Sequence, residues 1–220
     1  MDLIDVTPDG NDVQEQVSNK ILTVPNVISF FRLCLIPVFF VLLMNGYDVA
    51  AAVTFAFTAA TDFLDGLVAR STNSVSRLGQ LLDPFVDRLL IITVVLALLL
   101  VDRLPIWIVV LVVARDALML CVGSYLIKKW RVRVAVIFPG KVATACLMVG
   151  CAALLLNIPL IPGLGWCDIS WLPGFNFNPV GWGIWFIYAG LVLLLFTTTY
   201  YGVKAVEGVR IAKARLSEKE

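Results

Sequence analysis

The stretch DFLDGLVARSTNSVSRLGQLLDPFVD, residues 62–87, says more about this chain than any other. It places four carboxylates, those of Asp62, Asp65, Asp83 and Asp87, in segments that are otherwise apolar enough to cross a membrane. Each ionised Asp at the centre of a membrane helix costs about 2.5–3.5 kcal/mol on insertion scales. Four such groups need a strong compensating partner, and a pair of divalent cations is the obvious one.

The composition of the chain identifies a polytopic membrane protein. Of its 220 residues, 60% are hydrophobic and only 15% are charged, and the mean hydropathy is +0.92. A soluble domain of this length could not bury that much apolar surface. The net charge of +1 indicates no nucleic-acid partner. The chain has no His, which excludes imidazole bases and His-ligated zinc or haem.

Six apolar runs of roughly 20 residues, each long enough to span a bilayer, recur along the chain. The sequence therefore predicts an all-α integral membrane protein with six transmembrane helices. We place the spans at residues 27–45, 49–70, 79–101, 105–127, 140–161 and 180–204.

Two tails flank this six-helix domain, which we assign to residues 20–204. Residues 1–19 look like a mobile polar tail. Residues 205–220 form a basic amphipathic tail, which we expect to be a helical extension that lies at the inner membrane surface.

The positions of Lys and Arg orient the spans. With both termini cytoplasmic, 13 of the 17 basic residues fall in inside segments, and the outside loops hold only Arg103. Arg32, Arg88 and Arg115 fall within spans. Because cytoplasmic loops carry an excess of basic residues, we predict that both termini and the loop after Arg70 lie in the cytoplasm. The outer loop at 162–179, rich in Trp, Pro, Gly and Asn, is expected to cap the membrane interface.

Helical spacing gathers the carboxylates on two stripes. Asp62, Asp65 and Gly66 share one face of the second span, and Asp83 and Asp87 share one face of the third. Two antiparallel helices joined by a short loop can turn these faces toward each other. Oxygen ligands of this kind suit Mg²⁺ or Mn²⁺, and four Asp residues can bridge two ions about 4 Å apart, as in phosphoryl chemistry.

Two other interpretations of the carboxylates stay open. They could form buried structural ion pairs with Arg88 and Arg115, although two bases leave four acids incompletely paired. For Arg88 we expect instead that it faces away from the site and pairs with another helix. The carboxylates could also line the path of a cation transporter or a proton relay. Such a path gives no reason for the Gly, Ala and Arg residues to occur at fixed spacings from the carboxylates.

The pattern D-x2-D-G-x2-A-R-x8-G-x3-D-x3-D resembles the signature of the CDP-alcohol phosphatidyltransferases, and every position is met between Asp62 and Asp87. Members of that family have six helices with both termini cytoplasmic, in agreement with the topology above. The segment Pro25-Asn26-Val27-Ile28-Ser29-x-x-Arg32 is similar to the family's first-helix pattern.

The resemblance implies an enzyme of phospholipid biosynthesis that transfers a phosphatidyl group from CDP-diacylglycerol to an alcohol and releases CMP. It implies that Asp62, Asp65, Asp83 and Asp87 hold two Mg²⁺ or Mn²⁺ ions, and that Asp87 is also the general base for the acceptor hydroxyl. Arg70 would contact the diphosphate of the CDP-lipid. The full set of CDP-lipid contacts would be Pro25, Asn26, Val27, Ile28, Gly66, Arg70 and Ser76.

The signature does not identify the acceptor alcohol. The pair Arg115-Asp116 and the stretch Gly140-Lys141-x-x-Thr144 are similar to segments of bacterial phosphatidylglycerophosphate synthases, which favours sn-glycerol 3-phosphate. The same Gly-Lys-x-x-Thr feature occurs in cardiolipin synthases of this superfamily, which use phosphatidylglycerol and are the close alternative. Residues that could bind the acceptor phosphate are Arg115, Arg131, Arg133 and Lys141.

Location and assembly complete the expectations. The resemblance and the charge bias together indicate a multi-pass protein of a bacterial inner (cytoplasmic) membrane, with the active site facing the cytoplasm. Its partners would be CDP-diacylglycerol, the alcohol acceptor and membrane lipids, and family members are often homodimers.

Overall fold

Six helices account for most of the computed structural model. It describes residues 4–6, 24–72, 77–130, 132–134, 137–166, 169 and 171–217, and the side chains of residues 62–84 fall outside the description. The helices are α1 (Val24–Met44), α2 (Asp48–Thr72), α3 (Arg77–Leu100), α4 (Ile106–Trp130), α5 (Phe138–Leu156) and α6 (Gly183–Ser217). The expectation of six helices in an all-α chain is confirmed.

Four short strands complete the described structure. β1 (Ile4–Val6) pairs antiparallel with β2 (Val132–Val134), with Asp5 opposite Arg133. β3 (Leu160–Ile161) pairs antiparallel with β4 (Val180–Gly181) in the connection between α5 and α6. The pairing of β1 was not expected, because we assigned residues 1–19 to a mobile polar tail.

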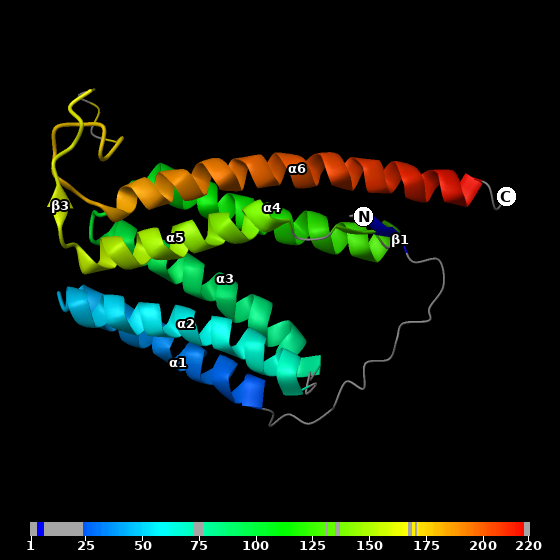
Figure 1. Cartoon of the computed structure of the whole chain (residues 1–220), viewed down its shortest axis with the longest axis horizontal. Coiled ribbons are helices and arrows are strands. Elements are labelled where there is room, and N and C mark those ends of the chain that lie inside the picture. The colour runs from blue at the N-terminus through cyan, green and yellow to red at the C-terminus, as the bar shows by residue number, and fades with distance from the viewer. Residues whose placement is uncertain are drawn as a thin grey trace.

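The connections divide the molecule into two ends (Figure 1). The loop end holds the short α1–α2 and α3–α4 turns and the long α5–α6 connection, residues 157–182. The signature end holds the start of α1, the junction of α2 with α3, and the junction of α4 with α5. β1 and the last turns of α6 also lie at the signature end (Figure 1).

Glycines bring α5 and α6 into close contact. A Cβ on Gly183 would overlap the carbonyl oxygen of Gly150 and lie 2.7 Å from the Cβ of Ala153. A Cβ on Gly150 would lie 2.8 Å from Cδ1 of Ile187. Small residues are what allow helix backbones to approach this closely inside a membrane, where apolar burial alone does not drive association.

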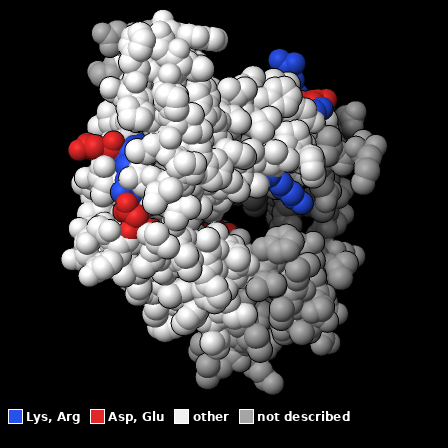
Figure 2. Space-filling view, turned by 60° about the vertical axis from the view of Figure 1, so that its left-hand side comes forward, with Lys and Arg blue, Asp and Glu red and all other residues white. Residues whose placement is uncertain are grey.

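The outer surface of the helices is apolar. Phe30, Val53 and Val192 are more than 60% exposed, and the face in Figure 2 shows few charged side chains outside the grey residues. Four described segments are long and apolar enough to cross a membrane: Val27–Met44, Ile106–Leu126, Phe138–Leu156 and Gly183–Lys213. A shorter apolar segment, Asp48–Thr61, lies in α2. A crossing by all six helices stays a prediction.

Helix boundaries differ from the expected spans at the last two helices. α5 stops at Leu156 because Asn157 adopts a left-handed conformation, with φ 56°, and Pro159 follows two residues later. α6 runs without a break through Ser217, so most of the segment that we separated as a C-terminal tail is the continuation of a membrane-length helix.

Candidate functional site at the signature end

The signature residues lie on two helices that both pack against α1. Asp62, Asp65 and Gly66 belong to the second half of α2, and Asp83 and Asp87 lie one turn apart in α3. Of these, Asp87 has a described side chain. Whether the other three carboxylates face it stays a prediction.

Asp87 is held by an arginine from the first helix. Nη1 of Arg32 donates a hydrogen bond to Oδ1 of Asp87 at 2.7 Å. Arg32 is buried, with 1% of its side chain exposed, whereas 40% of the Asp87 side chain is accessible. The interpretation that the carboxylates pair with intramembrane Arg holds in this one respect, although the partner is neither Arg88 nor Arg115. An Arg inside an apolar span requires an acidic partner, and that requirement was the signal in the sequence.

The residues expected on the CDP-lipid lie around the same end. Pro25, Asn26, Val27 and Ile28 form the first turns of α1, where Val27 is exposed and Ile28 half-buried. A nucleotide contact there stays a prediction. The other side chains of this set lie outside the description: those of Pro25, Asn26, Gly66, Arg70 and Ser76.

Arg88 and Arg115 converge on a single carboxylate. Arg88 of α3 contacts Oδ2 of Asp116 at 2.6 Å, and Arg115 contacts Oδ1 at 2.8 Å. Asp116 is buried in α4. Nε of Arg115 also donates to Oγ1 of Thr198 in α6 at 3.2 Å. The expectation that Arg88 pairs with another helix is confirmed. The Nη1 and Nε atoms of Arg115 both contact other residues of the protein.

Lys141 is exposed in the first turn of α5. A tyrosine of α6 fixes this helix start, because the N–H of Ile137 donates to the hydroxyl of Tyr201 at 2.9 Å. A Cβ on Gly140 would lie 3.2 Å from that hydroxyl, a tight contact, so the glycine before Lys141 leaves room for this hydrogen bond. Tyr201 is a positioning residue that the sequence analysis missed, since no local pattern links α6 to the start of α5.

The two remaining candidates for acceptor binding, Arg131 and Arg133, precede α5. Arg133 lies in β2, opposite Asp5, and its side chain is outside the described set. Arg131 lies outside the described residues altogether. The structure therefore places Lys141 at the start of α5, at the signature end, and Arg115 in the middle of α4. The acceptor-binding roles of all four residues stay predictions.

The chemistry of the donor set fits hard divalent cations. The signature supplies four carboxylates, and oxygen ligands are those that Mg²⁺ and Mn²⁺ prefer. Among the described side chains no group of three potential ligands gathers, and three of the four Asp residues lie outside that set.

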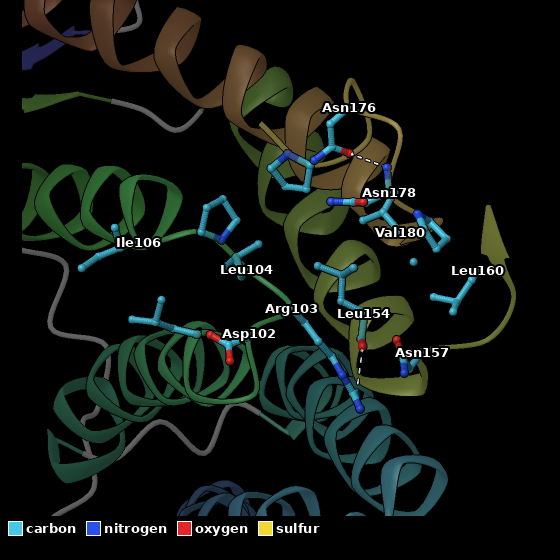
Figure 3. Close-up of a pocket in the computed structure, with 15 residues that line it drawn as sticks. Asp102, Arg103, Leu104, Ile106, Leu154, Asn157, Leu160, Asn176, Asn178 and Val180 are labelled. Carbon is cyan, nitrogen blue, oxygen red and sulfur yellow. Dashed lines mark hydrogen bonds between the residues drawn. The ribbon is translucent and has the colours of Figure 1, made fainter. Parts of the chain in front are cut away.

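A cavity of about 570 Å³ opens at the opposite, loop end. Figure 3 shows Asp102 and Arg103 from the α3–α4 turn together with Asn157, Asn176 and Asn178 around it. Arg103 donates to the carbonyl of Leu155 at 2.8 Å and pairs with Asp48 of α2 at 2.6 Å. Asp87, the signature carboxylate whose side chain is described, does not line this cavity, which lies at the opposite end of the helices from the candidate site.

Comparison with known proteins identifies relatives along most of the chain. The family model described as CDP-alcohol phosphatidyltransferase matches residues 22–201. A Mycobacterium tuberculosis protein named as a candidate cardiolipin synthase is 36% identical over 196 residues, 87% of each chain. A CMP-forming cardiolipin synthase of Streptomyces coelicolor is 34% identical over 194 residues, 83% of this chain and 88% of its own. The CDP-diacylglycerol–glycerol-3-phosphate 3-phosphatidyltransferase of Bacillus subtilis is 29% identical over 176 residues, 72% of this chain and 91% of its own.

Proposed function

Because the chain belongs to the CDP-alcohol phosphatidyltransferase family, we propose that it transfers the phosphatidyl group of CDP-diacylglycerol to phosphatidylglycerol and forms cardiolipin and CMP. The observation that carries this choice is the similarity to cardiolipin synthases along most of both chains, at 36% and 34% identity. The acceptor first favoured, sn-glycerol 3-phosphate, has weaker support, from a relative at 29% identity.

The contacts of Arg115 support the same choice. Its Nη1 and Nε are engaged by Asp116 and Thr198, and Arg88 shares the same carboxylate. These contacts reduce the positive charge that Arg115 can offer to a small, doubly charged phosphate. A lipid acceptor, with a singly charged phosphodiester and two acyl chains anchored in the bilayer, depends less on such a charge.

The proposed reaction uses the signature residues as follows. Asp87 accepts the proton of the acceptor hydroxyl, whose oxygen bonds to the phosphorus that carries diacylglycerol. The bond from that phosphorus to the oxygen shared with CMP breaks, and CMP leaves with the electron pair. Arg70 binds the diphosphate. Two divalent cations, held by Asp62, Asp65, Asp83 and Asp87, would supply positive charge beside the diphosphate and the departing phosphate.

We further propose that the signature end faces the cytoplasm of a bacterial inner membrane. The bias of Lys and Arg toward this end supports the orientation. A homodimer, expected from the resemblance, stays a prediction that chemical cross-linking in the membrane would test.

sn-Glycerol 3-phosphate is the second candidate acceptor. Besides the Bacillus subtilis relative, the exposure of Lys141 at the start of α5 favours it. The N-terminal turn of a helix and a Lys side chain together attract a phosphate group.

The test is a reconstituted assay with paired acceptors. The purified protein in liposomes receives CDP-diacylglycerol and either phosphatidylglycerol or sn-glycerol 3-phosphate, each with Mg²⁺ or Mn²⁺. Released CMP is measured, and the lipid product is identified by mass spectrometry. EDTA is expected to abolish CMP release, and added metal to restore it, while the thermal unfolding midpoint shows that the protein stays folded.

Each outcome decides between the candidates. Cardiolipin formed only with phosphatidylglycerol supports the proposal. Phosphatidylglycerophosphate formed only with sn-glycerol 3-phosphate replaces it with the second candidate. A folded protein that releases no CMP with either acceptor contradicts both.

A further inference from the structure

The inward face of α1 carries one charged residue. Ser29, Arg32, Ile36, Phe39 and Leu43 recur at helical spacing and are each 4% exposed or less. Arg32 therefore sits in a stripe that is otherwise apolar apart from the Ser29 hydroxyl. A guanidinium in such a place is retained only with an acidic partner, and Asp87 provides it.

The pair is asymmetric in its accessibility. Arg32 is 1% exposed, while the Asp87 side chain remains 40% exposed at 2.7 Å from it. On either side of Asp87 along α3, Val86 and Leu90 are buried in the core. The guanidinium of Arg32 thus lies between the carboxylate of Asp87 and the core, and the carboxylate is accessible from the side opposite the core.

We propose that Arg32 is a positioning residue for Asp87, which rests on the proposed role of Asp87 as general base. Arg32 fixes Oδ1 of the carboxylate and so holds the side chain in one orientation toward the acceptor hydroxyl. A charge-assisted hydrogen bond of this length restricts the rotation of the carboxylate.

The other described ion pairs that join separate elements differ in which partner is buried. In the pair of Arg88 with Asp116 the acid is the buried partner, at 7% exposure against 33% for the Arg. Arg103 and Asp48 at the loop end are 18% and 27% exposed, so neither is fully buried. Among these described pairs, the one at Asp87 joins a buried cation to an open carboxylate, as expected where the carboxylate must meet a substrate.

The experiment compares Arg32→Gln and Arg32→Lys with the wild-type protein in the same assay. We expect Arg32→Gln to lower kcat about a hundredfold, the usual effect of a misplaced catalytic group. Arg32→Lys keeps the charge but loses the planar fork, and is expected to lower kcat only about tenfold. The equilibrium Kd for CDP-diacylglycerol, measured without acceptor, should change by less than about threefold in both variants, since Arg32 acts on the acceptor side.

Two further variants separate positioning from structural support. Arg103→Gln removes a partly buried ion pair of similar length at the loop end, and should lower the unfolding midpoint while kcat stays near wild type. Arg32→Gln combined with Asp87→Asn should be no slower than Asp87→Asn alone, because the two residues act as a unit.

Three results would overturn the proposal. The first is a kcat of Arg32→Gln within about threefold of wild type, and the second is a Kd of this variant for CDP-diacylglycerol that weakens as much as its kcat falls. The third is an additive loss of kcat in the double variant. If Arg32→Gln does not fold, the folded Arg32→Lys protein decides: a wild-type kcat overturns the proposal. Inactivity of the wild-type protein with both acceptors would instead refute the proposed function. The test remains valid if sn-glycerol 3-phosphate rather than phosphatidylglycerol is the acceptor, because in both reactions Asp87 accepts the proton of the acceptor hydroxyl.

Discussion

The loop end and the signature end of these helices are held together by different kinds of contact. At the loop end, glycines bring α5 and α6 together, and Trp107 stacks on Tyr188 with ring centroids 6.3 Å apart. Arg103 ties the α3–α4 turn to α2 and α5. At the signature end, the buried Arg32 pairs with the carboxylate of Asp87, and the α1–α3 group diverges from the α4–α6 group toward that end (Figure 1).

The difference indicates that the loop end stabilises the fold and that the signature end provides the candidate active site, a division of roles between the two ends. The two Asp residues at the opposite ends, Asp48 and Asp87, each bind one arginine at 2.6 or 2.7 Å. At the loop end the arginine also satisfies backbone carbonyls, so the pair stabilises a junction. At the signature end the carboxylate stays accessible and is available for chemistry. Close packing at one end allows costly charges to be kept at the other.

The same substitution at both ends gives the sharpest test of this division. Asp87→Asn is expected to lower kcat by about a thousandfold, within the range for loss of a general base, and also to lower the free energy of unfolding, because the buried Arg32 loses its charged partner. Asp48→Asn should leave kcat within about twofold and lower the free energy of unfolding by about 1–2 kcal/mol, because Arg103 loses its charged partner. Equal effects of the two variants on kcat would contradict the division.

Glycine substitutions test the packing of the loop end. Gly183→Ala places a Cβ against the Gly150 carbonyl and 2.7 Å from the Cβ of Ala153, and should lower the free energy of unfolding by about 1–3 kcal/mol. Gly202→Ala is the matched control on the same helix, since nothing lies within 4 Å of its added Cβ. It should be neutral or slightly stabilising. Thermal unfolding in detergent measures both, and a stable Gly183→Ala protein would argue against close packing.

Lys141 tests whether the acceptor binds at the start of α5. Lys141→Gln should raise KM for the acceptor about tenfold, the usual effect of one lost contact to a phosphate, and leave KM for CDP-diacylglycerol unchanged. Lys129→Gln is the control, since Lys129 is an exposed residue near the end of α4. An unchanged acceptor KM in Lys141→Gln would remove this residue from the site.

Substitution of one tyrosine at each end is expected to give the smallest effects, on stability at the loop end and on KM at the signature end. Tyr188 donates to the carbonyl of Pro173 at the loop end at 2.8 Å, so Tyr188→Phe should lower the free energy of unfolding by about 1 kcal/mol without changing KM. Tyr201 accepts from the N–H of Ile137 at the signature end. Tyr201→Phe should raise KM for the acceptor about threefold, since the start of α5 loses a fixed hydrogen bond. Exchanged phenotypes would contradict the comparison.

Local patterns predicted the helices well and their contacts poorly. Apolar runs of membrane length placed all six helices, since length and composition suffice to mark such a segment. The pairing of Arg32 with Asp87 joins residues 55 apart in the chain and depends on how two helices are rotated against each other. Helical periodicity fixes which residues share a face but not which face another helix meets, and the roles of Arg103 and Tyr201 were hidden for the same reason.

The length of α6 gives the molecule a rigid stalk. Its 35 residues measure about 52 Å at 1.5 Å per residue, whereas the hydrocarbon layer is about 30 Å thick. A straight helix that starts near one interface therefore extends roughly 20 Å beyond the other. Its last charged turns would stand upright among the headgroups and the water above them. A fluorophore on Lys213 would report that height directly, through its distance from a quencher in the bilayer.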